Sequence, residues 1–379
     1  MSGGMELYLH MPFCVRKCSY CDFLSFPSGA KTQRMYAKRL MEDIGVMGKR
    51  YGEIPVETIF IGGGTPSVPD SGLIVEIMEH VRHAFHVADG AEISMEANPG
   101  TVTREKLTDY RKAGINRLSF GLQSANDREL KLLGRIHTWA EFLESFTLAR
   151  ECGFANLNID LMSALPGQTC ESWKETLSRV TDLDPEHISA YSLIIEEGTP
   201  FGERYGSEEG RKLLPDEDSE REMYHETKQF LKDCGYERYE ISNYAKPGRE
   251  CRHNIGYWTG VPYLGLGLGA SSYLDGCRFT VNPDMKQYLE EKPGMFTDIE
   301  KLTKKDMEEE FFYVGLRMTA GVSLSEFERR FGISAKEVYP GLMETFVKEK
   351  AARFEGDRFV LTDYGLDVSN YIMAQFLQD

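Results

Sequence analysis

Six short apolar segments, each followed by an amphipathic segment, occupy the chain from residue 6 to about residue 195. The predicted strands are residues 7–11, 58–61, 91–95, 117–120, 157–162 and 188–194. The helical patterns between them include residues 35–47, 73–85, 104–113, 142–151 and 173–183. This alternation predicts an α/β fold in which crossover helices connect the strands of a parallel sheet. Because six units are too few for a closed eight-stranded barrel, we expect an open, partial (β/α)6 barrel.

Chemically distinctive motifs lie at or just beyond the ends of five predicted strands. In chain order they are a cysteine-rich loop at 14–21, Gly62-Gly63-Gly64-Thr65-Pro66, Glu96-Ala97-Asn98-Pro99, Gly121-Leu122-Gln123-Ser124, and Asp160 with the later Leu165-Pro166-Gly167-Gln168. The carboxyl ends of parallel strands share one edge of a sheet, where ligands bind. The polar side chains expected to converge there are Glu96, Gln123, Arg135 and Asp160. Taken singly, each is more often a helix cap or a solvated charge, but their ordered spacing favours a site.

The cysteine-rich loop places Cys14, Cys18 and Cys21 three and two residues apart. A [4Fe–4S] cluster is usually held by four thiolates, so three would leave one iron free for a small molecule. The alternative is structural zinc, which needs four ligands and would have to borrow Cys251 or His253. Disulfides are not expected, because nothing in the chain indicates export. The sequence therefore favours an iron–sulfur site.

The glycine run 62–64 has two interpretations. Glycines let the backbone approach a ligand closely and leave the N–H groups unhindered, which suits a bound amino-acid moiety. The alternative is a tight turn between strand and helix with no ligand. Proximity to the cysteine loop favours the ligand.

A second cluster spans residues 251–258 and contains His253, Tyr257 and Trp258. An imidazole can ligate haem iron, and the two aromatic side chains could form apolar walls for a flat macrocycle. Three cations that could meet carboxylates lie just upstream of the aromatic pair: Lys246, Arg249 and Arg252. On residue types alone, a buried histidine in an aromatic core is the commoner arrangement. The nearby Gly265-Leu266-Gly267-Leu268-Gly269-Ala270 matches a dinucleotide pattern, but no amphipathic helix follows, so we expect a packed strand or turn.

Composition limits the partners and the compartment. The 379 residues carry a net charge of −16, which argues against nucleic acid or an anionic membrane as the dominant partner. The first residues lack the basic and apolar regions of a signal peptide, and no run of about 18 apolar residues predicts a transmembrane segment. Five further cysteines are scattered, as in a reducing compartment. We therefore expect a cytoplasmic protein.

The remaining chain divides into two parts. A Gly-, Glu- and Arg-rich connector at 196–215, a helix at 219–233 and an aromatic, glycine-rich stretch precede residue 300. Helical patterns then lead to a hairpin at 353–361, with Gly356-Asp357 near its turn, and to a last helix at 363–376. This order predicts a winged-helix-like module without a basic stripe, and so one that packs or binds a protein partner. The expected domains are a core at 1–195, a connector and end of core at 196–299 that carries His253, and a helical C-terminal domain at 300–379.

Together these motifs resemble the oxygen-independent coproporphyrinogen III oxidase family of radical S-adenosylmethionine (SAM) proteins, and more narrowly its HemW-type haem chaperone branch. The resemblance covers nearly the whole chain. Its specific signals are Tyr8-Leu-His-Met-Pro-Phe-Cys14, the C-x3-C-x2-C spacing with Tyr20, the Gly-Gly-Gly-Thr-Pro run, Asn158-Ile-Asp160-Leu-Met and Gly315-Leu-Arg-Met-Thr-Ala-Gly321. The resemblance implies that Cys14, Cys18 and Cys21 hold the [4Fe–4S] cluster. By the same resemblance, the positions that contact SAM are Tyr8, Tyr20, Gly64, Thr65, Glu96, Gln123, Arg135 and Asp160.

Two departures separate this chain from the oxidase. Phe23 stands where the oxidase has a fourth cysteine, and only seven residues precede Tyr8, where the oxidase has a longer extension. Conversely, His253-Asn254-x-x-Tyr257-Trp258 matches an H-N-x-x-Y-W signature that the chaperone branch associates with haem. The resemblance thus implies a haem chaperone, rather than an enzyme, that delivers haem to an acceptor protein; it also allows a homodimer. The alternatives are coproporphyrinogen III oxidation by a SAM-derived radical and a radical SAM reaction on another substrate.

Overall fold

The computed structural model describes residues 3–377, and its largest element is one twelve-stranded sheet. The strand order is β12-β11-β10-β9-β1-β2-β3-β4-β5-β6-β8-β7. The predicted strands are β1 (Met5–Met11), β2 (Val56–Gly63), β3 (Val87–Ala97), β4 (Arg117–Gln123), β5 (Leu157–Ser163) and β6 (His187–Ser192). These six pair in parallel and in chain order, so the parallel sheet predicted from the alternation is confirmed.

Strands that follow the connector extend this sheet at both edges. They are β7 (Glu237–Arg238), β8 (Asn243–Ala245), β9 (Tyr263–Leu266), β10 (Ser271–Leu274), β11 (Cys277–Thr280) and β12 (Thr297–Lys301). Strand β9 pairs with β1 in parallel, whereas β8 pairs with β6 antiparallel. The glycine-rich stretch after residue 262 is therefore a packed strand and turn, as its sequence predicts.

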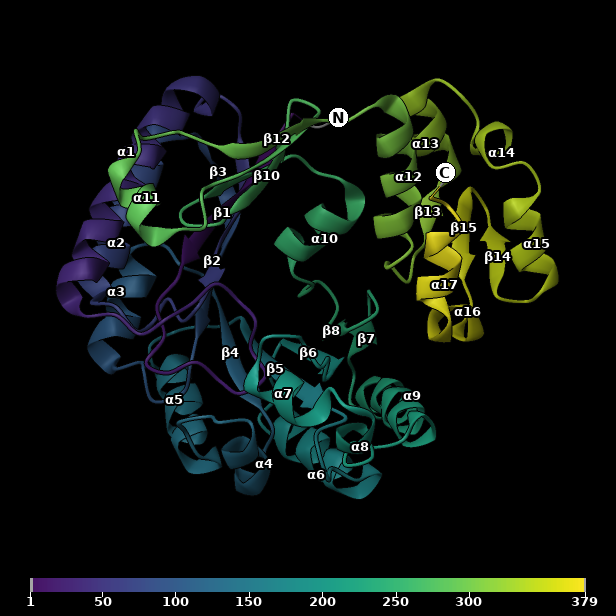
Figure 1. Ribbon diagram of the computed structural model, residues 1–379, viewed down its shortest axis with the longest axis horizontal. Coiled ribbons are helices and arrows are strands. Elements are labelled where there is room, and N and C mark those ends of the chain that lie inside the picture. The colour runs from purple at the N-terminus through teal and green to yellow at the C-terminus, as the bar shows by residue number, and fades with distance from the viewer. Residues whose placement is uncertain (1–2, 378–379) are drawn as a thin grey trace.

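Helices connect the strands. In the part of the chain before residue 291 they are α1 (Ala30–Tyr51), α2 (Ser71–Ala84), α3 (Arg104–Lys112), α4 (Asp127–Leu132), α5 (Trp139–Glu151), α6 (Cys170–Thr181), α7 (Pro200–Tyr205), α8 (Glu208–Arg211), α9 (Glu217–Asp233), α10 (Arg252–Thr259) and α11 (Met285–Glu290). Figure 1 shows α1, α2, α3 and α5 on the outer side of the sheet. The segment 196–215, expected to be a connector, contains α7 and α8.

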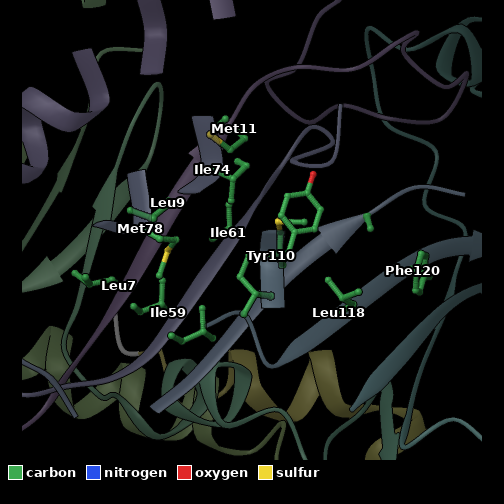
Figure 2. Close-up of a cluster of buried hydrophobic side chains, with 14 of the residues drawn as sticks. Leu7, Leu9, Met11, Ile59, Ile61, Ile74, Met78, Tyr110, Leu118 and Phe120 are labelled. Carbon is green, nitrogen blue, oxygen red and sulfur yellow. The ribbon is translucent and has the colours of Figure 1, made fainter. Parts of the chain in front are cut away.

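The outer face of the parallel strands forms the main hydrophobic core. Side chains alternate between the two faces of a strand, so residues 7, 9 and 11 of β1 point to the same side. Figure 2 shows the apolar side chains packed there, among them Leu7, Leu9, Met11, Ile59, Ile61, Ile74, Met78, Tyr110, Leu118 and Phe120. All ten are buried. Their burial against the helices supplies most of the hydrophobic stabilisation of this part of the fold.

The inner face of the same strands is polar. The residues that alternate with the apolar set include Glu6, Tyr8, His10, Thr58, Glu92, Ser94, Glu96, Arg117, Ser119, Asn158, Asp160, His187 and Ser189. The register brings them side by side, with Glu6 opposite Thr58, Thr58 opposite Glu92, and Asp160 opposite Ser189. Buried polar groups need hydrogen-bond partners or ligands. The polar face is therefore where a binding site is expected.

The chain after residue 301 forms a separate hydrophobic cluster. Its elements are α12 (Lys304–Gly315), β13 (Val322–Ser323), α13 (Leu324–Phe331), α14 (Ala335–Val338), α15 (Leu342–Lys348), β14 (Ala352–Glu355), β15 (Arg358–Leu361), α16 (Asp363–Asp367) and α17 (Ser369–Ala374). The predicted hairpin is confirmed as β14 and β15, which form a three-stranded antiparallel sheet with β13. The predicted last helix is two short helices that meet at Val368.

Helix α10 lies between the sheet and this C-terminal segment (Figure 1), and it packs against both β2 and α12. Its C-cap, Gly260, adopts a left-handed conformation with φ 69°, which ends the helix at a residue without a Cβ penalty. Among residues 3–377, none of the helices is long and apolar enough to cross a membrane.

Candidate functional site

The cysteine loop directly follows β1 and is fixed by backbone hydrogen bonds. The N–H of Cys14 donates to the Phe26 carbonyl at 3.1 Å, and the N–H of Ser19 donates to the Leu133 carbonyl at 3.0 Å. The three thiols of Cys14, Cys18 and Cys21 are partly exposed, and none forms a disulfide. The loop therefore presents three free thiols at the carboxyl edge of the sheet.

Two of the thiols lie beside polar groups from other loops. The Sγ of Cys14 is 3.5 Å from the Oγ1 of Thr65, and the Sγ of Cys18 is 3.5 Å from the Nη1 of Arg135. The guanidinium of Arg135 donates to Cys18, and the Thr65 hydroxyl can donate to Cys14. Burial raises the pKa of Cys21. The donor set fits a cluster that takes thiolate ligands.

The glycine run beside the loop uses its N–H groups inside the protein. Gly63 donates to a carboxylate oxygen of Glu96 at 2.9 Å, Gly64 to the Met11 carbonyl at 2.9 Å, and Thr65 to the Phe13 carbonyl at 2.7 Å. These three N–H groups therefore already have partners within the protein, and the expectation that the run contacts a ligand stays a prediction. The glycines also allow close packing: a Cβ on Gly63 would lie 2.4 Å from the His10 ring.

Two carboxyl groups face the interior near the ends of β3 and β5. Burial, together with the charge of Asp160, raises the pKa of Glu96 to about 8. Burial likewise raises the pKa of Asp160, although it accepts hydrogen bonds from Ser119 at 3.1 Å and Asn158 at 2.7 Å. Two buried carboxyl groups with raised pKa values suit a ligand that brings its own positive charge.

Asn98 connects the glycine run to the cysteine loop, and sequence reasoning did not select it as a site residue. Its Nδ2 donates to the Oγ1 of Thr65 at 2.7 Å, and its Oδ1 accepts from the Nη2 of Arg135 at 2.6 Å. Arg135 in turn reaches Cys18 and the Gly121 carbonyl. The signal that could have found it is the Asn-Pro pair directly after the third strand.

Several buried polar atoms in this region have no partner among residues 3–377. They are the Oε1 of Gln123, the Nε of Arg135 and both ring nitrogens of His137. Gln123 also adopts a positive φ of 76°, which is uncommon for a residue with a side chain. Buried polar atoms normally have hydrogen-bond partners, so these atoms fit a polar ligand at the same edge of the sheet.

The two predicted tyrosines lie on either side of this edge. The hydroxyl of Tyr8 is 3.0 Å from the Nδ1 of His10 on the same strand. Tyr20, in the cysteine loop, packs against Phe201 with ring centroids 6.5 Å apart, and burial raises its pKa. The sheet edge thus brings together the cysteine loop, the glycine run, Glu96, Gln123, Arg135 and Asp160.

His253 lies far from the cysteine loop, at the opposite ends of the strands. Its Nδ1 is 2.7 Å from the Oγ1 of Thr58, and its Nε2 is 3.1 Å from the hydroxyl of Tyr257. The side chain is 1% exposed. Burial, together with the charge of Arg117, lowers its pKa to about 3. The imidazole is therefore neutral, and both of its nitrogens already have partners.

This position rules out His253 as a ligand to a zinc ion at the cysteine loop. His253 contacts Thr58, which pairs with Glu6 of β1, whereas the cysteine loop begins after Met11, the last residue of β1. Glu6 and Met11 are five residues apart, and a strand rises about 3.3 Å per residue, so roughly 16 Å separate His253 from the start of the loop. A zinc ion needs its ligands within about 2.3 Å. Cys251 also lies at the far end, because its thiol is 3.4 Å from Glu92. Within residues 3–377, no three His, Cys, Asp or Glu side chains converge around a single ion. A [4Fe–4S] cluster does not need its three thiolates to converge on one ion, because each thiolate binds a different iron.

A cavity of about 1430 Å³ opens between the sheet and the C-terminal segment. Its lining runs from the site described above, at Tyr8, Gly63 and Glu96, to Tyr257 and Trp258 of α10. Phe23, which is 62% exposed, also lines it. The cavity therefore joins the sheet edge to the second sequence cluster, while His253 lies behind Tyr257.

The fold and the site define a class of protein. Residues 8–180 match the Radical SAM superfamily, and residues 302–368 match the HemN C-terminal domain. Superfamily membership implies a [4Fe–4S] cluster and SAM. The solved structure of coproporphyrinogen III oxidase (HemN) from Escherichia coli superposes with a TM-score of 0.84 at 24% identity, covering 99% of this chain and 90% of that one. That likeness establishes the shared fold.

Full-length relatives narrow the class to one family. The chain is 35% identical to the heme chaperone HemW of Bacillus subtilis (strain 168), over 98% of each chain. It is also 35% identical to the heme chaperone HemW of Escherichia coli (strain K12), covering 99% of this chain and 98% of the relative. The chain belongs to the HemW family.

Proposed function

We propose that this protein is a haem chaperone, which binds haem and transfers it to an acceptor protein. The observation that carries the proposal is the full-length likeness to relatives named heme chaperones. Two further features support it. The H-N-x-x-Y-W signature borders the large cavity through Tyr257 and Trp258, and Phe23 replaces the fourth cysteine of the oxidase.

The proposed cluster ligands are Cys14, Cys18 and Cys21. A [4Fe–4S] cluster held by these three thiolates would supply one-electron chemistry and a binding site for SAM. The proposed SAM contacts are Tyr8, Tyr20, Gly64, Thr65, Glu96, Gln123, Arg135 and Asp160. In the protein itself, Arg135 orients Cys18, Thr65 orients Cys14, and Asn98 holds both of these partners in place.

His253 is proposed as the haem-associated residue of the signature. Its imidazole is neutral, which is the form that ligates iron. To reach haem in the cavity, the ring has to give up its hydrogen bond to Tyr257. Tyr257 thus controls access of the imidazole to the cavity.

We propose a division of the chain into a partial-barrel core at 1–195, a connector and end of core at 196–299, and a winged-helix-like domain at 300–379. The second hydrophobic cluster, which runs from Phe312 to Phe376, supports the last boundary. The proposed compartment is the cytoplasm, and the protein can act as a monomer or a homodimer.

Anaerobic reconstitution followed by separate additions of haem and coproporphyrinogen III tests the proposal. A chaperone shows a saturable Soret shift and loses its haem to an apo-acceptor. It makes no more than one equivalent of protoporphyrinogen in a chromatographic assay with SAM and reductant. Multiple turnovers would contradict the chaperone function and establish the oxidase alternative.

A further inference from the structure

The cavity described above is lined by residues of the sheet and of two helices. Tyr8 and His10 come from β1, Tyr257 and Trp258 from α10, and Phe311 and Val314 from α12. Its volume exceeds the range of roughly 300–1,000 Å³ that is usual for small-molecule sites. It can therefore take a ligand with a large flat apolar body.

The charge of the cavity differs from that of the chain. Five cationic side chains line it, namely Arg278, Lys304, Arg329, Arg330 and Arg358. Four carboxyl groups accompany them, and burial holds one of these, Glu96, near neutrality with a pKa of about 8. The whole chain has a net charge of −16. A local excess of cations in an acidic protein points to an anionic ligand.

Arg330 is the cation best placed to meet that anion. Its Nε donates to Glu326 at 2.5 Å, and its guanidinium lies 5.4 Å from the centre of the Phe311 ring. Its Nη1 lies next to Gly260, where a Cβ would approach it to 3.1 Å. The two terminal nitrogens make no hydrogen bond to any residue between 3 and 377. They form an open fork that matches a carboxylate.

Trp258 supplies an independent sign of a missing acceptor. Its ring lines the cavity, yet its Nε1 is buried and has no partner in the described part of the chain. Trp258 lies two residues before Gly260, the residue that Arg330 approaches. A buried indole N–H normally finds an acceptor. Trp258 and Arg330 thus both line the cavity, and each has an N–H group that could donate to an acidic group of a ligand.

We propose that this cavity is the haem site, with the tetrapyrrole between α10 and α12 and a propionate on the guanidinium of Arg330. The assignment rests on the proposed function and adds the binding position and the anchoring residue. Glu326 keeps a second partner in Arg329, which donates to it through Nε at 2.7 Å and Nη2 at 2.6 Å. Arg330 can therefore turn to a propionate without leaving Glu326 unpaired.

The test compares haem with haem dimethyl ester, whose propionates carry no charge, by Soret titration of the full-length protein. Arg330→Gln is expected to weaken haem binding about tenfold or more, which is the loss of one charge-assisted hydrogen bond, and to leave ester binding unchanged. Arg353→Gln is the matched control: Arg353 is an exposed arginine of β14 that does not line the cavity. It should bind both ligands as the wild type does.

A second variant examines the apolar side independently. Val314→Asp places a charge on the α12 wall and should weaken binding of haem and of its ester alike, while thermal unfolding confirms that the variant is folded. If Arg330→Gln binds haem as tightly as the wild type does, or if it loses as much affinity for the ester as for haem, the proposed site is wrong. Either result would leave the chaperone function intact. Wild-type protein that binds neither ligand would overturn the proposed function and this site with it.

Discussion

The Nδ1 of His253 lies 2.7 Å from the Oγ1 of Thr58, which places the signature histidine inside the polar face of the sheet rather than in the open cavity. The same ring stacks on Phe60 with centroids 5.3 Å apart. Glu6 is 3.9 Å away, but burial raises the pKa of its carboxyl to about 9, so neither group is charged at neutral pH and the contact is not an ion pair. The histidine is thus held by neutral hydrogen bonds, which can be exchanged at modest cost.

His253→Ala is expected to abolish the Soret shift that haem produces in the wild type, because the variant has no imidazole to exchange Tyr257 for iron. It should also lower the free energy of unfolding by about 1–3 kcal/mol, since the hydroxyls of Thr58 and Tyr257 lose a buried partner. His80→Ala is the control, because His80 is an exposed histidine of α2. An unchanged Soret spectrum in His253→Ala would remove His253 as the ligand.

Replacing any one of Cys14, Cys18 or Cys21 by serine should abolish the iron–sulfur absorbance after anaerobic reconstitution, because a three-thiolate site has no spare ligand. The same change at Cys152 or Cys277 should leave the iron content and the absorbance unchanged. Both of these cysteines are free and partly exposed, and they lie outside the loop. Cluster loss in either control variant would contradict the assignment of the ligands.

Glu6 makes stability depend on pH. Burial, together with the charge of Glu92, raises the pKa of its carboxyl from 4.5 to about 9, against the opposing effects of a hydrogen bond from Thr58 and the charge of Arg252. The folded state therefore binds more protons than the unfolded state between these values, and the free energy of unfolding falls as pH rises from about 4.5 to 9. The slope from one such group is at most about 1.4 kcal/mol per pH unit.

Glu6→Gln should remove this contribution, because the amide resembles the protonated acid and does not titrate. Denaturant titration from pH 5 to pH 8.5 measures the free energy of unfolding of both proteins. We expect Glu6→Gln to become progressively more stable relative to the wild type as the pH rises. Glu105→Gln, at an exposed position on α3, is the control and should run parallel to the wild type. A parallel curve for Glu6→Gln as well would show that its carboxyl is ionised in the folded protein.

Much of the core and of the sheet edge was predictable from local patterns. Each parallel strand alternates apolar residues toward the helices with polar residues toward the interior, so hydrophobicity marks the strands. The expected convergence of Glu96 and Asp160 follows from parallel pairing, which places the ends of β3 and β5 at one edge, and the charge of Asp160 contributes to the raised pKa of Glu96. The roles of individual residues toward SAM and the cluster stay predictions.

The rest depends on contacts that local sequence does not encode. The parallel pairing of β9 with β1 joins residues about 250 positions apart, and the choice of partner follows from packing of the whole sheet. The burial of His253 arises because Gly256 lets α10 approach Glu6 closely: a Cβ there would lie 1.9 Å from Glu6 Oε1. The i,i+4 spacing of His253 and Tyr257 puts them on one helix face, which is the one local hint of their hydrogen bond.

Gly63 is expected to be intolerant of any side chain. Its φ of 111° is a conformation that residues with a Cβ rarely adopt, and the added Cβ of Gly63→Ala would lie 2.4 Å from the His10 ring. That ring is held by Tyr8 at 3.0 Å and by the Leu24 carbonyl at 2.9 Å, so it cannot move away freely. We expect a loss of about 2–4 kcal/mol in unfolding free energy from strain and steric overlap together.

Gly90→Ala is the matched control, because Gly90 has a φ of 76° with nothing within 4 Å of a Cβ, and it should cost only about 1–2 kcal/mol. Because the overlap with His10 would displace the Gly63 N–H from Glu96, a proposed SAM contact, Gly63→Ala should in addition weaken SAM binding in equilibrium dialysis, whereas Gly90→Ala should not. Equal losses of stability in the two variants would show that the His10 ring yields, and that the close packing beside the cysteine loop is not what requires glycine at this position.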